Sequence, residues 1–386
     1  MYNKENNIKV CMRCIYDEKV PGIVFDNEGI CNYCRQVEDL EKEYKTGLPE
    51  GEQKFMEIVD TIKRSGKTKK YDCVLGISGG TDSCYMLYKA VEVGLRPLAV
   101  NYDNTWSTTI ANENIRKVTK KLGVDLHTYV VDNKEMDDIY CAFLKASVPA
   151  IDIPTDIALA EVLYRAASQY NVKYVLEGHS YKAEGVAPIG YSYFDGRYIK
   201  SIHDLYGNMK MKTFPNMTMF HFLKWILIKR IRKIRPLWYI NYSKEYAREF
   251  LAKNFNWCYY GGHHLENRMT AFSISYHNPY KFNMDQRNNS LSASVRSGLL
   301  TREKALAIYN TPPIIDPDLL EYIKKRLNYN DEDFENMMMA KHRSTFEFKT
   351  YKKTFEKMRP FFWIMYKYNL VPKSFYLKYA CKQTEK

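Results

Sequence analysis

Short apolar runs alternate with longer amphipathic stretches in the first half of this 386-residue chain. Strands that alternate with helices of this length are typical of a parallel, doubly wound α/β sheet. Because ligands bind beyond the carboxyl ends of the strands in such sheets, Ser78, Asp103 and residues 177–179 are expected along one rim. The apolar runs predict buried strands at residues 71–76, 97–103, 126–131 and 173–176.

The alternation fades from about Gly185, and the tail from about Asp316 has a helical, aromatic pattern. Residues 219–235, with the basic part at Lys224 to Arg235, predict a basic amphipathic helix that ends at Pro236. Such a helix can lie on a membrane surface or contact nucleic acid, but a packed helix with a solvated basic face is the simpler interpretation.

Two cysteine pairs near the N-terminus, Cys11-x-x-Cys14 and Cys31-x-x-Cys34, are separated by sixteen residues. This is the spacing of a four-thiolate zinc knuckle, in which each pair supplies two ligands from one tight turn. A disulfide pair or a redox dithiol is the alternative. The other five cysteines have no ligand spacing. We therefore expect four parts: a zinc knuckle at 1–40, a linker helix at 41–70, an α/β core at 71–200 and a mostly helical region at 201–386.

Composition agrees with a large soluble enzyme, and a cytoplasmic location is expected. The chain starts with polar residues and has no apolar run long enough to span a bilayer. A net charge of +13 and a pI near 9.0 favour an acidic partner, which includes nucleic acid, an anionic membrane surface and a phosphorylated small molecule. Charge alone does not choose between these partners.

The turn after the first predicted strand carries the pattern Ser-Gly-Gly-x-Asp-Ser at residues 78–83. The adjacent glycines Gly79 and Gly80 let the backbone turn sharply and expose consecutive N–H groups before a helix start. Such a turn can hold phosphate groups. It lacks the Gly-Lys-Ser/Thr ending of a Walker loop. The pattern instead resembles the PP-loop of the ATP pyrophosphatases, which split ATP into AMP and pyrophosphate while adenylating a substrate oxygen.

Further blocks make the chain similar to the N-acetyl sugar amidotransferases, bacterial PP-loop enzymes of surface-polysaccharide and flagellar nonulosonic acid pathways, including the pseudaminic acid branch. The resemblance covers nearly the whole chain. One departure is Thr81, where many PP-loops carry lysine. Besides the cysteine pairs and the loop, the resemblance rests on residues 102–106, 177–185, 260–264, 281–287 and 296–298.

This resemblance implies a HUP-like fold and a reaction in which ATP activates the N-acetyl group of a nucleotide sugar and ammonia replaces its oxygen. Mg²⁺ would bridge the phosphates, with Asp82 as the first ligand and Glu177 or Glu184 as the second. The expected ATP-binding residues are Gly76, Ser78, Gly79, Gly80, Thr81, Asp82, Ser83, Asp103 and Gly178. The expected catalytic residues are Asp82, Glu177, His179 and Lys281. The expected substrate-binding residues are Glu184, Lys281, Asp285 and Arg287.

Simpler interpretations stay open for several of these residues. The segment from Glu177 to Glu184 has the composition of an ordinary polar loop. Lys281, Asp285 and Arg287 can also pair with one another at the surface. His263 and His264 follow two glycines and are expected in a loop, because no further metal ligand is near them in sequence.

The resemblance also implies a separate glutaminase subunit, of the kind that serves histidine biosynthesis, because no cysteine here has a recognisable nucleophile motif. No stable nucleic acid is expected, and membrane-surface contact is expected to be weak. The main alternative is a PP-loop tRNA-modifying enzyme of the thiolase or lysidine-synthetase type. A thiolase needs further cysteines near its active site. A non-enzymatic zinc-knuckle adaptor is disfavoured by the intact loop.

Overall fold

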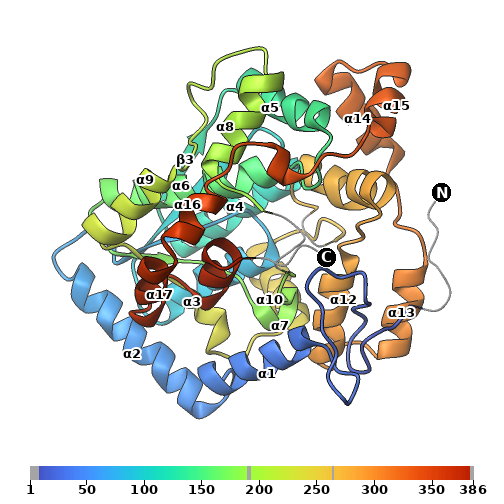
Figure 1. The fold of residues 1–386 in the computed structure, drawn as a ribbon. Helices are drawn as coiled ribbons and strands as arrows, with labels where there is room; N and C mark the ends of the chain where they lie inside the picture. The colour runs from blue at the N-terminus through green and yellow to red at the C-terminus, as the bar shows by residue number, and fades with distance from the viewer. Residues whose placement is uncertain (1–7, 189–192, 263–264, 383–386) are drawn as a thin grey trace.

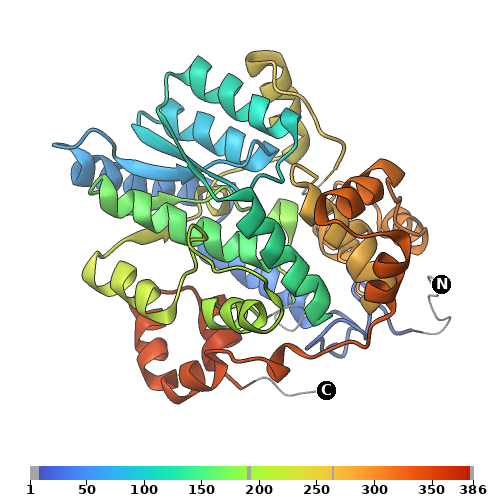
Figure 2. The same ribbon diagram turned by 90° about the horizontal axis from the view of Figure 1, so that it is seen from above.

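The molecule is built on a five-stranded, wholly parallel sheet. Figures 1 and 2 show this sheet surrounded by helices. The computed structural model describes residues 8–188, 193–262 and 265–382. The strands are β1 (Cys73–Gly76), β2 (Pro97–Asp103), β3 (Leu126–Val130), β4 (Tyr174–Leu176) and β5 (Arg232–Ile234), in the order β3-β2-β1-β4-β5. The first four lie where the apolar runs predict them, which confirms the α/β fold class.

The strand order reverses between β1 and β4. From β1 the chain moves outward through β2 and β3, and then returns to the other side of β1 with β4. In doubly wound sheets the crevice for a ligand opens at such a reversal, at the carboxyl ends of the two strands. The topology therefore places the segments that follow Gly76 and Leu176 side by side.

Helices cover both faces of the sheet (Figure 2). Side chains alternate between the faces, as in any strand: Val74 packs in one cluster, and Cys73 and Leu75 pack in the other. The Leu75 face is covered by α2 (Pro49–Gly66), α3 (Thr81–Glu92), α4 (Thr109–Leu122) and α10 (Lys244–Phe255). The Val74 face packs against α6 (Ile153–Gln169), and the same hydrophobic cluster extends through α5 (Asn133–Ala146) and α8 (Gly196–Tyr206) to α14 (Pro317–Leu327) and α15 (Asp331–Met339).

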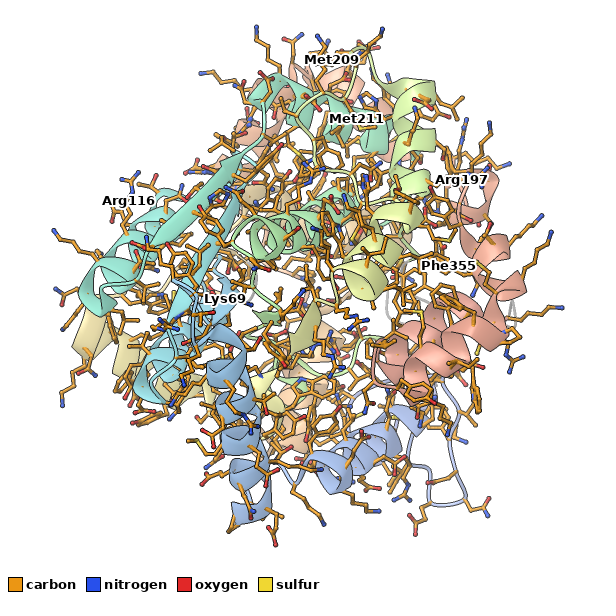
Figure 3. All side chains as sticks on the ribbon, turned by 90° about the vertical axis from the view of Figure 1, so that its left-hand side faces the viewer. Lys69, Arg116, Arg197, Met209, Met211 and Phe355 are labelled. Carbon is orange, nitrogen blue, oxygen red and sulfur yellow. The ribbon has the colours of Figure 1, made fainter. Side chains whose placement is uncertain are left out.

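The remaining helices lie around this core. Figure 3 shows Phe355 among the C-terminal helices and Arg116 on the opposite side of that view. The α-helices are α1 (Asn32–Tyr44), α7 (Tyr181–Glu184), α9 (Met219–Leu223), α11 (Arg268–Phe272), α12 (Arg287–Arg296), α13 (Arg302–Asn310), α16 (Lys352–Lys357), α17 (Arg359–Lys367) and α18 (Lys373–Phe375). The π-helices are η1 (Lys224–Ile228), η3 (Ser273–Lys281) and η5 (Tyr376–Ala380), and the 3-10 helices are η2 (Pro236–Trp238) and η4 (Thr345–Glu347).

The prediction of one basic amphipathic helix over 219–235 is wrong. The helix passes into a π-turn, the backbone reverses at Arg230 with φ 53°, and β5 follows. Two interactions favour this path. The Trp225 indole N–H donates to the buried carboxylate of Glu161 at 2.9 Å, and β5 pairs with β4 along its whole length. The α/β core was predicted to end at residue 200, but its fifth strand, β5, comes from residues beyond that boundary.

The N-terminal segment lies beside α12 and α13, far from it in sequence (Figure 1). Ile15 packs with Ala305 and Tyr309, and the Ile15 N–H donates to Ser292 Oγ at 3.3 Å. Arg302 donates from Nε to the carbonyls of Cys11 and Cys14, at 3.0 and 3.1 Å. These contacts attach the cysteine-rich segment to the C-terminal half of the chain. Within the described ranges, no helix has the length and apolar character needed to cross a bilayer.

Candidate functional site

A deep cleft of about 2260 Å³ opens at the carboxyl ends of β1 and β4. Pockets for drug-sized ligands usually hold about 300–1,000 Å³, so this cleft has room for more than one such ligand. The residues after β1, the residues after β4, and α10 all contribute to its lining. Of the residues predicted for the site, those that line it are Gly76, Ser78, Gly80, Asp82, Ser83, Glu177, Gly178, His179, Glu184 and Arg287.

The loop between β1 and α3 is fixed by contacts to its backbone. Gly79 has φ +81°, and a Cβ there would lie 2.2 Å from the Ala111 carbonyl oxygen. Only glycine fits this position. The Gly79 carbonyl accepts hydrogen bonds from Trp257 Nε1 at 3.0 Å and Asn114 Nδ2 at 3.3 Å. Ser78 Oγ accepts from the Gly80 N–H at 3.3 Å. The loop is thereby held with its outer surface in the cleft.

Asp82, in the first turn of α3, is joined to α10. Lys244 Nζ lies 2.8 Å from its Oδ2, and the Tyr242 hydroxyl donates to its Oδ1. Burial alone would raise the pKa of Asp82, but the charge and hydrogen bond of Lys244, with further bonds from Tyr242 and Glu184, lower it below its ordinary value. Asp82 and Glu184 therefore lie close together in the cleft as a carboxylate pair.

Glu177, which follows β4, is paired with cations from the neighbouring strand β5. Lys233 contacts Oε1, and Arg235 Nε lies 3.3 Å from Oε2. Burial would raise the pKa of Glu177, but the two positive charges lower it to about 2. A group with this pKa stays ionised at neutral pH and does not serve as a general acid there. The structure thus shows Glu177 holding Lys233 and Arg235 at the cleft wall.

His179 has its ring orientation set by a tryptophan. Trp238 Nε1 donates to His179 Nδ1 at 3.2 Å, so in the neutral ring the proton is on Nε2, which lies 3.6 Å from Glu184 Oε2. The start of α3 packs against the backbone of Gly178, the residue before His179. A Cβ on Gly178 would lie 2.9 Å from the carbonyl of Asp82. Close packing here brings the two rim segments together.

Several predicted site residues lie outside the cleft lining. Asp103 Oδ1 accepts from the Thr105 N–H at 2.8 Å, and Thr81 and Gly79 are covered by neighbouring chain. Lys281 is buried and donates to the Met337 carbonyl, and burial lowers its pKa to about 8. The structure therefore does not bring Lys281 to the other proposed catalytic groups.

Asp285 and Arg287 pair with each other, as the simpler interpretation expected. Arg287 Nη2 lies 2.7 Å from Asp285 Oδ2 and also donates to the Thr311 carbonyl at 2.7 Å. This pair fastens the start of α12 to the segment after α13. Arg287 reaches the cleft lining and Asp285 does not. His263 and His264 lie outside the described residues.

Other residues of the cleft were missed by the sequence interpretation. Lys244 and Arg248 line the cleft from α10, a segment whose pattern indicates only a helix, and Lys244 contacts Asp82 across 162 positions. Tyr242, just before α10, bonds Asp82 from outside the lining. Asn114 and Trp257, which hold the loop, likewise carry no motif. Tyr260 belongs to a block that the family resemblance includes, and its hydroxyl would lie 3.1 Å from a Cβ placed on Gly80.

The four N-terminal cysteines form one buried cluster. Their Sγ atoms all lie within 4.8 Å of one another, with Cys11–Cys34 at 3.9 Å and Cys14–Cys31 at 3.8 Å. Tetrahedral zinc with Zn–S bonds of about 2.3 Å requires Sγ separations of about 3.8 Å. The arrangement fits a four-thiolate metal site. Arg296 Nη1 lies 3.8 Å from Cys34 Sγ and supplies positive charge beside the negative thiolates.

Comparisons with known proteins found several similarities. Residues 266–359 match the family model of the LPS biosynthesis protein WbpG-like, C-terminal domain. The chain is 29% identical over 171 residues to the uncharacterized protein MJ1599 of Methanocaldococcus jannaschii, across 44% of this chain and 58% of that protein. It is 28% identical over 141 residues to the tRNA-specific 2-thiouridylase MnmA 2 of Fusobacterium nucleatum, across 34% of this chain and 39% of that protein.

The alignments thus span little more than half of the first relative and about two fifths of the second. Among solved structures, the NMN synthetase of Francisella tularensis matches with a TM-score of 0.32 and 16% identity, across 76% of this chain and 98% of that one. The WbpG-like match confirms the predicted resemblance to enzymes of surface-polysaccharide biosynthesis for the matched segment. It covers the segment that contains α11 to α16.

Proposed function

We propose that this chain, a PP-loop protein with a WbpG-like C-terminal domain, is an ATP-dependent, AMP-forming amidotransferase. Its substrate is the N-acetyl group of a nucleotide-activated sugar used in surface polysaccharide or flagellar glycan biosynthesis. The product is an acetamidino sugar. One observation carries the proposal: the PP-loop and the WbpG-like segment face the same cleft.

The cleft has two kinds of wall. One wall is the loop of residues 76–83 with the segment after β4, and it supports ATP binding. The WbpG-like segment contributes Asn267, Gln286 and Asn289 to the lining of the same cleft. Amide side chains are suitable hydrogen-bonding partners for sugar hydroxyls and acetamido groups. The volume allows ATP and a nucleotide sugar to bind together.

The chemistry requires activation because an amide carbonyl is a poor electrophile. The acetamido oxygen attacks the α-phosphorus of ATP, a P–O bond forms, and pyrophosphate leaves. Ammonia then attacks the adenylated carbon, a proton is lost, and AMP departs with the former amide oxygen. Backbone N–H groups of the loop stabilise the negative charge that develops on pyrophosphate.

Two metal ions belong to the proposal. Asp82 and Glu184 supply neighbouring carboxylate oxygens, the ligands that Mg²⁺ prefers. When bound there, Mg²⁺ would neutralise phosphate charge. Zn²⁺ would be held by Cys11, Cys14, Cys31 and Cys34. A closed four-thiolate site leaves no position for substrate, so the ion would be structural and would fix the fold of the N-terminal segment, which Ile15 and Arg302 attach to α12 and α13.

His179 is the proposed group for moving a proton in the cleft. Trp238 fixes the ring so that Nε2 carries the proton and faces Glu184. Because Nδ1 already accepts from Trp238, the ring can act only as a donor, and its Nε2 proton is proposed to go to an oxygen of the departing AMP, while the proton that ammonia loses goes to solvent. The ammonia would come from a separate glutaminase subunit, because none of the nine cysteines lines the cleft.

A tRNA-modifying enzyme is the second candidate, and the Fusobacterium relative favours it. A thiolase of this type requires reactive cysteines beside the PP-loop. Here Cys73 and Cys84 are buried behind the loop, and burial raises the pKa of Cys84 to about 12. Cysteines with raised pKa values are poor nucleophiles. This arrangement supports the amidotransferase over the thiolase.

Incubation of the purified chain with ATP, Mg²⁺, ammonium and a panel of nucleotide N-acetylhexosamines tests the proposal. Mass spectrometry should find AMP together with a sugar nucleotide in which NH replaces oxygen. With ¹⁸O in the acetamido group, the label should appear in AMP. AMP that forms only in the presence of tRNA would reject the amidotransferase in favour of the second candidate.

A further inference from the structure

We infer that Lys244 and Arg248, one turn apart on α10, supply the positive charge that many PP-loops carry as a lysine within the loop. Lys244 neutralises Asp82, and Arg248 binds the β- and γ-phosphates of the nucleotide and then the departing pyrophosphate. This inference rests on the proposed function, since it takes ATP as the ligand of the loop.

The loop itself cannot provide a cation. Residues 76–83 contain one charged side chain, Asp82, and it is negative. At the position where many PP-loops have lysine, Thr81 is only 1% exposed, does not line the cleft, and has no hydrogen-bond partner for its Oγ1 in the described part of the chain. A loop with one carboxylate and no cation would repel a triphosphate. Beyond the charge that Mg²⁺ and the loop N–H groups would offset, a cationic side chain has to come from another element.

Lys244 provides the first part of that charge. Its Nζ lies 2.8 Å from Asp82 Oδ2. Burial would lower the pKa of Lys244, but the carboxylates of Asp82 and Glu184 raise it above its ordinary value. Lys244 is therefore charged at neutral pH. Because that charge is shared with two carboxylates, it brings this corner of the cleft towards neutrality without attracting an anion by itself.

Arg248 provides the charge that remains. Its guanidinium lines the cleft and stacks over the ring of Tyr259, with Cζ 4.5 Å from the ring centroid. Its Nε is buried and has no hydrogen-bond partner, and no carboxylate among the described residues forms an ion pair with it. Three other arginines line the cleft: Arg235 is paired with Glu177, Arg287 is paired with Asp285, and Arg232 is exposed on β5.

A stacked guanidinium next to a phosphate-binding loop has a specific ligand chemistry. Stacking on an aromatic ring fixes the plane of the guanidinium and leaves its edge free. That edge matches two oxygens of a phosphate group in a bidentate pair. The geometry indicates a di- or triphosphate as the ligand. A nucleotide sugar also carries a diphosphate, so the test must separate the two sources.

The test compares Arg248→Met, Arg248→Lys and wild type in the full-length protein, with Arg116→Met as the control. Methionine keeps the apolar contact with Tyr259 and removes the charge. Arg116 is exposed on α4, outside the cleft lining (Figure 3). Calorimetric titrations with ATP, AMP, inorganic pyrophosphate and UDP-N-acetylglucosamine, all with Mg²⁺, report which phosphates the side chain contacts.

We expect Arg248→Met to weaken binding of ATP and pyrophosphate about tenfold or more, because charge-assisted hydrogen bonds are lost. AMP and UDP-N-acetylglucosamine should bind as in wild type. Arg248→Lys should recover part of the loss, and Arg116→Met should change nothing. Circular dichroism on each variant checks that the fold is retained.

Unchanged ATP affinity in Arg248→Met would overturn the inference while leaving the proposed function in place. An equal loss for AMP and ATP would also overturn it, since the contact would then not be with the β- and γ-phosphates. A loss confined to UDP-N-acetylglucosamine would assign Arg248 to the sugar diphosphate instead. A wild-type protein that binds no ATP would overturn the proposed function, and this inference with it.

Discussion

Replacement of Asp82 by asparagine tests the link between the PP-loop and α10. Asparagine keeps the size of the side chain, and its oxygen can still accept from the Tyr242 hydroxyl. It removes the negative charge 2.8 Å from Lys244 Nζ. Lys244 is 9% exposed, so water replaces the lost partner only in part. Glu184 remains as a second carboxylate near it.

The size of the effect follows from burial. Breaking a fully buried ion pair costs about 3–5 kcal/mol, and an exposed pair contributes about 0–1 kcal/mol. The side chains of Asp82 and Lys244 are 15% and 11% exposed, near the buried limit. With Glu184 left in place, we expect Asp82→Asn to lower the free energy of unfolding by about 2–3 kcal/mol. AMP formation should fall about tenfold or more, equivalent to about 1.4 kcal/mol in the barrier.

The pH dependence follows from the lowered pKa of Asp82. A carboxyl group whose folded-state pKa is depressed contributes its stability above its unfolded-state pKa, near 3.9 for aspartate, and loses it as pH falls through the folded-state pKa. The stability difference between wild type and Asp82→Asn should therefore be complete at neutral pH. It should narrow as the pH falls below about 4.

Urea denaturation of wild type, Asp82→Asn, Lys244→Met and the double variant completes the assay. The two residues are in contact, so the double variant should lose less than the sum of the single losses. Additive losses would refute the ion pair as a coupled unit. A stability difference that stays constant from neutral to acid pH would refute the reasoning from the pKa of Asp82.

Three further predictions concern the metal, the rim and the nitrogen source. Metal analysis should find about one zinc per chain. The Cys31→Ser variant should contain no zinc and have a lower Tm. The Cys258→Ser variant, which removes an exposed thiol, should keep both the zinc and the Tm of wild type. Gly178→Ala should weaken ATP binding and lower the free energy of unfolding by about 1–3 kcal/mol, because the alanine methyl group would lie 2.9 Å from the Asp82 carbonyl. An ATP affinity equal to that of wild type would contradict this prediction. The isolated chain should use ammonium and hydrolyse no glutamine, and transfer of ¹⁵N from amide-labelled glutamine without a second protein would show that a glutaminase lies within the chain.

The sequence was sufficient for features that depend on neighbouring residues. The four apolar runs predicted the positions of β1 to β4, and β1, β2 and β4 are largely buried, as continuous apolar runs indicate. The prediction that the third strand is buried is wrong, because β3 lies at the edge of the sheet and its residues are exposed or half-buried. The Ser-Gly-Gly-x-Asp-Ser pattern predicted the turn before α3. At position 79 only glycine fits, because φ is +81° and a Cβ would clash with Ala111. The spacing of the cysteine pairs predicted a cluster whose Sγ atoms lie within 4.8 Å. Each of these signals is local.

The tertiary structure decided β5, which lies in a stretch with a helical, basic pattern. Three residues, Arg232 to Ile234, have too little apolar periodicity to predict a strand, and they become one because β4 offers a free edge. Pairing with that edge also brings Lys233 and Arg235 to Glu177. The interactions that stabilise β5 are made with β4, which is distant in sequence, so no local stretch of the sequence predicts this strand.

Sequence alone thus determined which residues form the parallel strands, the phosphate-binding turn and the cysteine cluster, because backbone preferences and ligand spacing act over a few positions. Only the tertiary structure decided which charges meet in the cleft. It brought Lys244 to Asp82 from 162 positions away, and buried Lys281 against Met337 outside the cleft. The physical reason is that a side chain's electrostatic partner depends on which helices pack together, and that packing is set by apolar contacts over the whole chain.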